Sequence, residues 1–259
     1  MSSNPLVVAN WKMNLSLAES RKLVVKLKSG LKNSAGCQII LCPSTNALTV
    51  MAGQIESTKS KPKFKLGAQN SAMSERGALT GEDSPFDIKK LGCSYVILGH
   101  SERRGKLGET DNIVNKKVKA ALEAQLIPIV CVGESWEDRQ NGNTDNHLIK
   151  QVTLALKNIK LARQKLIVAY EPVWAISTAG ANARAVQPIE AVTAHQVINE
   201  TLVDIFGEQV VEKNLKIIYG GSVNSENVRG FTGHSEIQGV LVGGASLDSK
   251  EFIQLVKNV

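Results

Sequence analysis

Three side chains that could carry acid–base chemistry each stand at or just beyond the end of a short apolar run: Lys12, His100 and Glu171. The clearest case is Glu171, because residues 166–169 form a continuous apolar run, which is typical of a strand buried on both faces. Pro172 lacks the N–H that a central strand needs, so the strand must stop there. A carboxylate can remove a proton beside a carbonyl, an imidazole can polarise the carbonyl oxygen, and an ammonium can stabilise the negative charge that develops. If the fold brings them together, these residues predict proton transfer next to a carbonyl.

Each of the three residues has a plainer interpretation when it is taken alone. A glutamate at the end of a strand is more often structural than catalytic, a lone lysine is usually a solvated surface residue, and a histidine can be a hydrogen-bonded core residue. Catalysis becomes the better interpretation only if all three lie on one rim of the fold.

Two glycine-rich turns suggest what the ligand carries. The sequences Gly220-Gly221-Ser222 and Gly243-Gly244 each precede a predicted helical turn, beginning near Asn224 and Ser246. Exposed N–H groups at the start of a helical turn bind anions, and barrels often hold phosphate after their seventh and eighth strands. The expected ligand is therefore a small phosphorylated carbonyl compound.

The elements that must position these residues form a regular alternation. Eight short apolar runs, most of them about 25 to 40 residues apart, are separated by segments with helical periodicity, which is typical of βα units. An open doubly wound sheet is the competing architecture, but it usually has a glycine-rich turn after its first strand, and this chain reads NWKMN there. The sequence predicts an α/β fold, a single (β/α)8 TIM barrel that occupies residues 1–259 as one domain. The runs are 6–10, 38–43, 64–69, 95–100, 126–133, 166–171, 215–221 and 239–244.

Two predicted helices have clear start signals. Ser16 and Glu19 have the spacing of a capping box, and Pro188 suits the first turn of a helix. Apolar stripes at helical spacing follow the capping box and recur later in the chain: Leu23, Leu27 and Leu31; Leu148, Val152, Leu156 and Ile159; Phe252, Leu255 and Val256.

Composition limits the classes of function. The net charge of +7 suits an anionic ligand or nucleic acid, but with only three Trp and three Tyr to stack on bases, nucleic-acid binding is disfavoured. No 18-residue apolar segment or signal peptide is found, so we expect a cytoplasmic protein. The four Cys form no C-x-x-C and the four His have no ligand spacing, so we expect reduced thiols and no metal site.

One connection is too long for a simple turn. Residues 71–84 have little apolar periodicity, and loops of this length are usually functional or disordered. We interpret them as an arm that packs into another subunit, with a disordered flap as the alternative.

At these residues the chain closely resembles the triosephosphate isomerase family. The matching stretches span the whole chain in order, and the set is highly specific, although any one of them alone would be weak. They are ANWKMN (9–14), GAQN (67–70), GALTGE (77–82), ILGHSERR (97–104), CVGE (131–134), AYEPVWAI (169–176), YGGSVN (219–224) and LVGGASL (241–247).

The resemblance implies the activity and a role for each site residue. The enzyme would interconvert dihydroxyacetone phosphate and D-glyceraldehyde 3-phosphate in glycolysis and gluconeogenesis, through an enediol(ate) and without a cofactor. Glu171 would be the base, His100 a neutral electrophile and Lys12 the positive charge. The other implied roles are substrate contact for Asn10, a place beside the lysine for Glu102, and phosphate binding for Ser177, Ser222, Gly243 and Gly244.

The resemblance also implies a homodimer and a lid. The arm at 71–84 would reach the neighbouring subunit and place Thr80 near the partner's active site, and residues 172–187 would close over the intermediate to exclude water. The lid departs from the family's common pattern AIGTGK, because it reads AISTAGANARAVQP, with four extra residues before Pro188. We expect a longer lid that closes with altered geometry around Ser177.

Three alternatives stay open at this point. The changed lid could accept a four-carbon ketose phosphate in a related isomerase. The chain could be a non-catalytic sugar-phosphate-binding homologue with a decayed lid, although its intact lysine, histidine and glutamate argue against this. A basic nucleic-acid binder rests on net charge alone.

Overall fold

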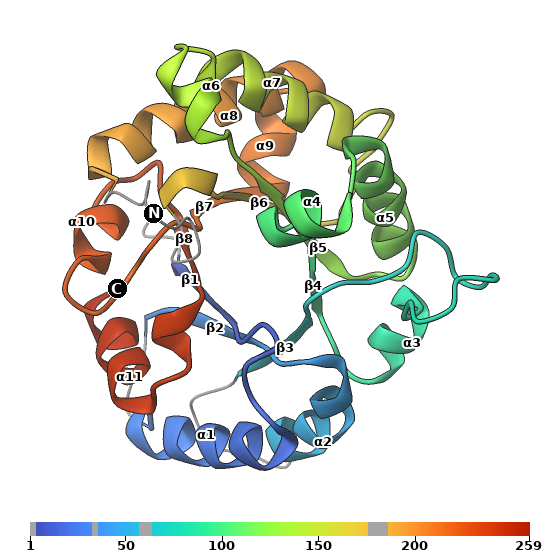
Figure 1. The fold of residues 1–259 in the computed structure, drawn as a ribbon, viewed down its shortest axis with the longest axis vertical. Helices are drawn as coiled ribbons and strands as arrows, with labels where there is room; N and C mark the ends of the chain where they lie inside the picture. The colour runs from blue at the N-terminus through green and yellow to red at the C-terminus, as the bar shows by residue number, and fades with distance from the viewer. Residues whose placement is uncertain (1–3, 33–35, 57–63, 176–185) are drawn as a thin grey trace.

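The strands of the computed structural model, which describes residues 4–32, 36–56, 64–175 and 186–259, form one closed parallel barrel in chain order. β1 pairs with β2 on one side and with β8 on the other, which closes the sheet. Figure 1 shows the strands at the centre of a ring of helices. The predicted (β/α)8 barrel is confirmed. The strands are β1 (Leu6–Asn10), β2 (Gln38–Cys42), β3 (Lys65–Ala68), β4 (Tyr95–Leu98), β5 (Ile127–Val132), β6 (Leu166–Tyr170), β7 (Leu215–Tyr219) and β8 (Gly239–Val242).

Helices follow the strands along the chain and cover the outside of the barrel (Figure 1). The α-helices are α1 (Leu17–Gly30), α2 (Thr45–Glu56), α3 (Pro85–Lys90), α4 (Ser101–Leu107), α5 (Asp111–Glu123), α6 (Trp136–Gln140), α7 (Thr144–Ala155), α8 (Pro188–Phe206), α9 (Glu208–Asn214), α10 (Val228–Thr232) and α11 (Ser249–Asn258). Within the described ranges, the short 3₁₀ helices are η1 (Val173–Ala175) and η3 (Gly244–Ser246).

The apolar runs are continuous because both faces of each strand are buried. In β1, Leu6 and Val8 pack with the side chains inside the barrel, whereas Val7 and Ala9 pack in the layer between the barrel and the helices. This burial on two sides is the reason that a parallel barrel strand shows no polar alternation.

The helix signals in the sequence are largely correct. The Ser16 hydroxyl accepts the Glu19 N–H, and the Glu19 carboxylate accepts the Ser16 N–H, so the capping box is formed. Two stripes extend beyond their helices, since α1 ends at Gly30, before Leu31, and α7 ends at Ala155, before Leu156 and Ile159. After α7 the chain turns through Asn158, which has a φ of +58°. Ile159 is nevertheless buried in the core.

The segment 71–84 contains no helix or strand and stands out from the ring between β3 and α3 (Figure 1). Its base is fixed, since the Ala72 N–H donates to the Asp83 carbonyl at 2.8 Å. The buried Lys117 ammonium also contacts the base, donating to Asn70 Oδ1 at 2.8 Å and lying 3.5 Å from Glu82. The arm therefore has an anchored base and an exposed tip.

The buried His195 makes the stability of the fold sensitive to acid. Its Nδ1 lies 3.0 Å from the Glu236 carbonyl, which can only accept, so the proton is on Nδ1 and Nε2 is bare. Nε2 is buried without a partner in the described part of the chain. Burial lowers the pKa of His195 to about 4, against the opposing effect of Glu236. Folding therefore favours the neutral imidazole.

We expect acid to destabilise the wild type through this residue. Well above pH 6.5, His195 is neutral in both the folded and the unfolded protein. Between about pH 6.5 and pH 4 the imidazole is protonated in the unfolded chain but stays neutral in the folded protein, so acid favours unfolding. The free energy of unfolding should fall by about 2 kcal/mol more between pH 7 and pH 5 than in His195→Asn, measured by urea unfolding at fixed protein concentration. The exposed His234 supplies the control, His234→Asn, which should retain the wild-type slope. Equal slopes in the wild type and His195→Asn would contradict the prediction.

The structure also answers two questions that composition raised, the state of the cysteines and the presence of a membrane-spanning helix. The four cysteines are free thiols, and three of them are buried. In the described part of the chain, no helix combines the length and the apolar character needed to cross a membrane.

Candidate active site

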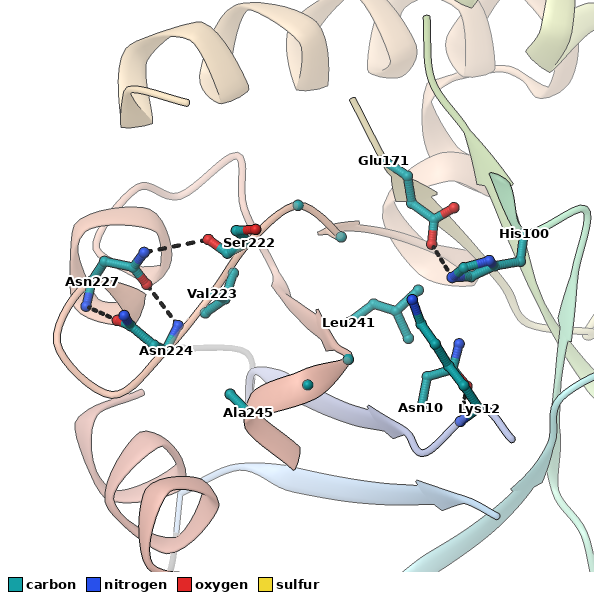
Figure 2. Close-up of a pocket in the computed structure, with 14 residues that line it drawn as sticks. Asn10, Lys12, His100, Glu171, Ser222, Val223, Asn224, Asn227, Leu241 and Ala245 are labelled. Atoms are coloured by element: carbon teal, nitrogen blue, oxygen red, sulfur yellow. Dashed lines mark hydrogen bonds and ion pairs between the residues drawn. The ribbon is translucent and has the colours of Figure 1, made fainter. Parts of the chain in front are cut away.

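A cavity of about 250 Å³ lies at the carboxyl-terminal ends of the barrel strands. Figure 2 shows Lys12, His100 and Glu171 on one side of this cavity and the loop that carries Ser222 on the other. The lining includes seven residues expected from the sequence, which are Asn10, Lys12, His100, Glu171, Ser222, Gly243 and Gly244. The convergence that the catalytic interpretation required is therefore present in the structure.

Glu171 is held by the ends of the strands around it. Its backbone N–H donates to the Val132 carbonyl of β5 at 2.7 Å, and only 2% of the residue is exposed. Its carboxylate accepts the N–H of Ser101 at 3.0 Å and lies 3.2 Å from His100 Nε2. Gly220 leaves room for this side chain, because a Cβ there would lie 2.8 Å from the Glu171 Cγ. The carboxylate is buried, paired and directed into the cavity.

His100 lies at the start of α4 and caps it. Its Nδ1 accepts the Glu102 N–H at 3.2 Å, so Nδ1 carries no proton in this arrangement. The hydrogen-bond pattern thus assigns the proton of a neutral imidazole to Nε2, which faces Glu171 (Figure 2). A neutral imidazole with its N–H directed into the cavity can donate to a carbonyl oxygen.

Lys12 is fixed in an unusual backbone conformation. Its φ is +51°, which is uncommon for a residue with a side chain, and the Asn10 side chain accepts its N–H at 3.1 Å. The Gln69 side chain donates to the Lys12 carbonyl at 2.9 Å. This backbone strain is the kind of feature that gathers at functional sites.

The Lys12 ammonium is paired with Glu102 at 2.7 Å. Burial raises the pKa of the Glu102 carboxyl, but the hydrogen bond and charge of Lys12 outweigh it, so the pKa lies below its usual value. Glu102 is therefore ionised at neutral pH and holds the ammonium at the cavity.

The glycine-rich turns form the other side of the cavity. Asn224 Oδ1 accepts the N–H groups of Glu226 and Asn227, so a turn does begin near Asn224, but the regular helix α10 begins only at Val228. The second turn, predicted near Ser246, begins two residues earlier, because η3 starts at Gly244. Gly244 has open space where a Cβ would project, so a ligand can approach its backbone closely.

Sequence reasoning missed two residues that lie at the ends of other strands. Gln69 follows β3 and fixes the Lys12 backbone, as described above. Glu134 follows β5, and its buried carboxylate accepts from Tyr170 at 3.1 Å and from Trp174 at 2.8 Å. Burial raises the pKa of Glu134, and these hydrogen bonds offset only part of the rise. The same attention to strand ends, applied to the third and fifth strands, could have found both.

The remaining predicted residues lie away from the cavity or outside the described chain. Thr80 is exposed on the arm, and Ser177 falls within residues 176–185, which the structure does not describe. Among the described residues, no group of three or more His, Cys, Asp or Glu side chains could hold a metal ion.

Comparison with known proteins assigns this arrangement to a family. A profile described as triosephosphate isomerase matches residues 5–259. The chain belongs to the triosephosphate isomerase family. Triosephosphate isomerases of Dictyoglomus turgidum and Endomicrobium trichonymphae are each 42% identical to it over 254 residues, which cover 98% of this chain and 98% of each relative.

A solved structure of a triosephosphate isomerase, from Bartonella henselae, supports the fold independently. It superimposes with a TM-score of 0.85 at 29% sequence identity and covers 99% of both chains. The resemblance seen in the separate motifs is therefore confirmed over nearly the full length of the chain.

Proposed function

We propose that Glu171 moves a proton between two adjacent carbons of a triose phosphate while His100 and Lys12 stabilise the enediolate that forms. Family membership makes the chain an aldose–ketose isomerase that interconverts dihydroxyacetone phosphate and D-glyceraldehyde 3-phosphate, a step of glycolysis and gluconeogenesis. The observation that carries the proposed roles is the buried contact between the Glu171 carboxylate and the protonated Nε2 of His100 at 3.2 Å.

This contact defines how the substrate must enter. The substrate carbonyl takes the place of Glu171 as the acceptor for His100 Nε2, so that the imidazole polarises the carbonyl as the base becomes free. The freed carboxylate then removes a proton from the neighbouring carbon and returns it to the former carbonyl carbon. The hydroxyl proton passes to the former carbonyl oxygen, so that the carbonyl and hydroxyl groups exchange places. Lys12 stabilises the charge on oxygen, and Asn10 contacts the substrate from the same strand end.

The phosphate end of the substrate is proposed to lie against Ser222, Gly243 and Gly244. These residues line the same cavity, and Gly243 lies close to Lys12, since a Cβ there would be 3.5 Å from the Lys12 Cε. Backbone N–H groups at the start of a helical turn suit an anion. The ammonium adds a positive charge between the reacting carbons and the phosphate.

Residues 172–187 are proposed to form the lid. Its first residues are anchored, because the Val173 N–H donates to the Glu134 carbonyl at 3.1 Å and the Trp174 side chain donates to the Glu134 carboxylate. Closure would exclude water from the enediolate, whose phosphate could otherwise be lost. Ser177 is proposed to contact the phosphate, and no cofactor or metal takes part.

A coupled assay tests the function directly. We expect rapid interconversion of the two triose phosphates, and much slower turnover of a four-carbon ketose phosphate. Faster turnover of the four-carbon substrate would assign the chain to a related isomerase, and binding of triose phosphate without turnover would assign it to a non-catalytic homologue.

We propose that the protein acts as a homodimer in the cytoplasm, joined through the arm at 71–84. The arm has a fixed base and an exposed tip, which suits insertion into a partner. The resemblance implies a dimer, and in the proposed dimer Thr80 would lie near the partner's Asn10 and Lys12.

A charge at Thr80 should therefore weaken the dimer and the activity together. For Thr80→Asp we expect a dimer dissociation constant at least about tenfold higher, or about 1.4 kcal/mol, because a carboxylate would be buried at the interface. Sedimentation and kcat, measured over the same range of protein concentration, should change in parallel, whereas Thr80→Ser should behave as the wild type. A fully active, stable monomer carrying Thr80→Asp would contradict the proposal.

A further inference from the structure

We infer that Arg104 is a positioning residue for the isomerisation, because its guanidinium joins the ends of β4 and β5 and so sets the distance between His100 and Glu171. The inference rests on the proposed function and adds to it a residue that does not line the substrate cavity.

The guanidinium binds three oxygen atoms on three different segments. Nε donates to the Gly99 carbonyl at 2.7 Å, and Nη2 donates to the Cys131 carbonyl at 3.2 Å. Nη1 donates to Asp111 Oδ1, in the first turn of α5, at 2.6 Å. The Asp111 carboxylate both orients the guanidinium and compensates its charge, so the effect of Arg104 on the site is mainly geometric.

These contacts lie where the pairing between two strands ends. The last matched residues of β4 and β5 are Leu98 and Val130. Gly99 then turns the chain away with a φ of +66°, so Gly99 and Cys131 do not continue the register. The guanidinium donates to the carbonyl groups of both residues, so it links the two strands beyond their last paired residues, Leu98 and Val130.

The two carbonyl groups that Arg104 binds each lie one residue before a residue that positions the reacting side chains. His100 directly follows Gly99. Val132 directly follows Cys131, and its carbonyl accepts the Glu171 N–H at 2.7 Å. A shift of either strand end would therefore change the 3.2 Å contact between His100 Nε2 and the Glu171 carboxylate.

The arrangement requires an arginine. The planar guanidinium presents five N–H donors in a fixed fork, which can serve three acceptors in different directions, whereas a lysine ammonium is a point charge on a flexible chain. A displacement of about 1 Å between reacting groups can cost about 10²-fold in rate. We therefore expect Arg104→Lys to be almost as slow as Arg104→Ala.

A second cavity beside the site makes a chemical rescue possible. It has a volume of about 220 Å³, and its lining includes Gly99, Arg104, Cys131 and Glu171. Removing the Arg104 side chain would extend this space, so that free guanidinium could enter and bind the same carbonyls.

The test compares Arg104→Ala, Arg104→Lys and the wild type. We expect kcat to fall about 10- to 100-fold in both variants. KM and the inhibition constant of inorganic phosphate should stay within about threefold, because neither substitution changes the residues proposed to bind phosphate.

Guanidinium at concentrations that leave the wild type folded should raise kcat of Arg104→Ala at least about fivefold, and methylammonium should not. The same additions should not raise kcat of Glu171→Asp. The exposed Arg163 supplies the matched arginine control, Arg163→Ala, which should keep the wild-type kcat.

A crystal structure of Arg104→Ala tests the geometry without reference to activity. We expect the distance from His100 Nε2 to the Glu171 carboxylate to exceed the 3.2 Å of the wild type. The inference is wrong if this distance is unchanged, if kcat stays within twofold of the wild type, or if phosphate affinity falls as much as kcat. If Arg104→Ala does not fold, Arg104→Lys, which can keep the pair with Asp111, decides by the same measurements. If the wild type were inactive but the His100–Glu171 distance were longer in the variant, the proposed function would be wrong while the positioning role of Arg104 would still hold.

Discussion

Replacing Glu171 with glutamine is expected to lower kcat by about 10³-fold, with KM for triose phosphate changed by less than about threefold. Glutamine has nearly the same shape but cannot accept the substrate proton. Its amide group would also place a donor among the Ser101 N–H and the His100 Nε2–H, which the carboxylate now accepts. Steady-state rates in both directions measure the effect.

Glu171→Asp separates the loss of the base from its displacement. Aspartate keeps a carboxylate but withdraws it by one methylene, so we expect a loss of about 10²-fold, smaller than that of the glutamine variant. Glu226→Gln, at an exposed position in the loop before α10, serves as the control and should keep the wild-type rate. If Glu171→Gln retained more than about a tenth of the wild-type kcat, another group would have to be the base.

Replacing Lys12 with methionine is expected to lower kcat/KM by about 10³-fold. Methionine retains most of the apolar stem but removes the ammonium at the cavity, so both the binding of the phosphorylated substrate and the stabilisation of the enediolate are lost. It also leaves Glu102 without its partner at 2.7 Å, and the unpaired carboxylate would repel the anionic substrate. We therefore expect the inhibition constant of inorganic phosphate to rise as kcat falls.

Two variants test whether the ammonium itself is responsible. Lys116→Met removes an exposed lysine of α5 and should have no effect on either constant. Lys12→Arg keeps a positive charge in the strained backbone and should retain more activity than Lys12→Met. Wild-type phosphate affinity in a folded Lys12→Met would show that Lys12 acts on the reaction alone.

The barrel could be predicted because its strands are buried on both faces. Residues 166–169, for example, show no polar alternation, since Ile167 and Ala169 fill the barrel interior while Leu166 and Val168 pack against the helices. The position of Glu171 at the end of this run then follows from the chain itself. Because all barrel strands end at the same rim, Lys12 and His100 could be placed beside it without a structure.

The contacts that support the site residues could not be predicted. They join segments that are far apart in the sequence, and no local sequence pattern indicates which segments will meet. Nothing near Lys12 indicates its φ of +51° or the hydrogen bond that its carbonyl accepts from the Gln69 side chain. The same is true of Glu134, whose partners Tyr170 and Trp174 lie on another strand end. Such contacts are specified by the assembled barrel and not by local pattern. Residues 176–185, which include Ser177, lie outside the described residues, so the altered lid stays a prediction.

The closure of β1 against β8 has a consequence for how the enzyme is made. Lys12 and Gly243 come from opposite ends of the chain and meet only when these two strands pair. Contacts of such long sequence separation form late in folding, because the cost of closing the chain must be met first. During synthesis, a ribosome-bound chain that lacks β8 would have its base and its imidazole but no complete phosphate side. We therefore expect activity to appear only after β8 has left the ribosome and paired with β1, so that the onset of activity measures when the barrel closes.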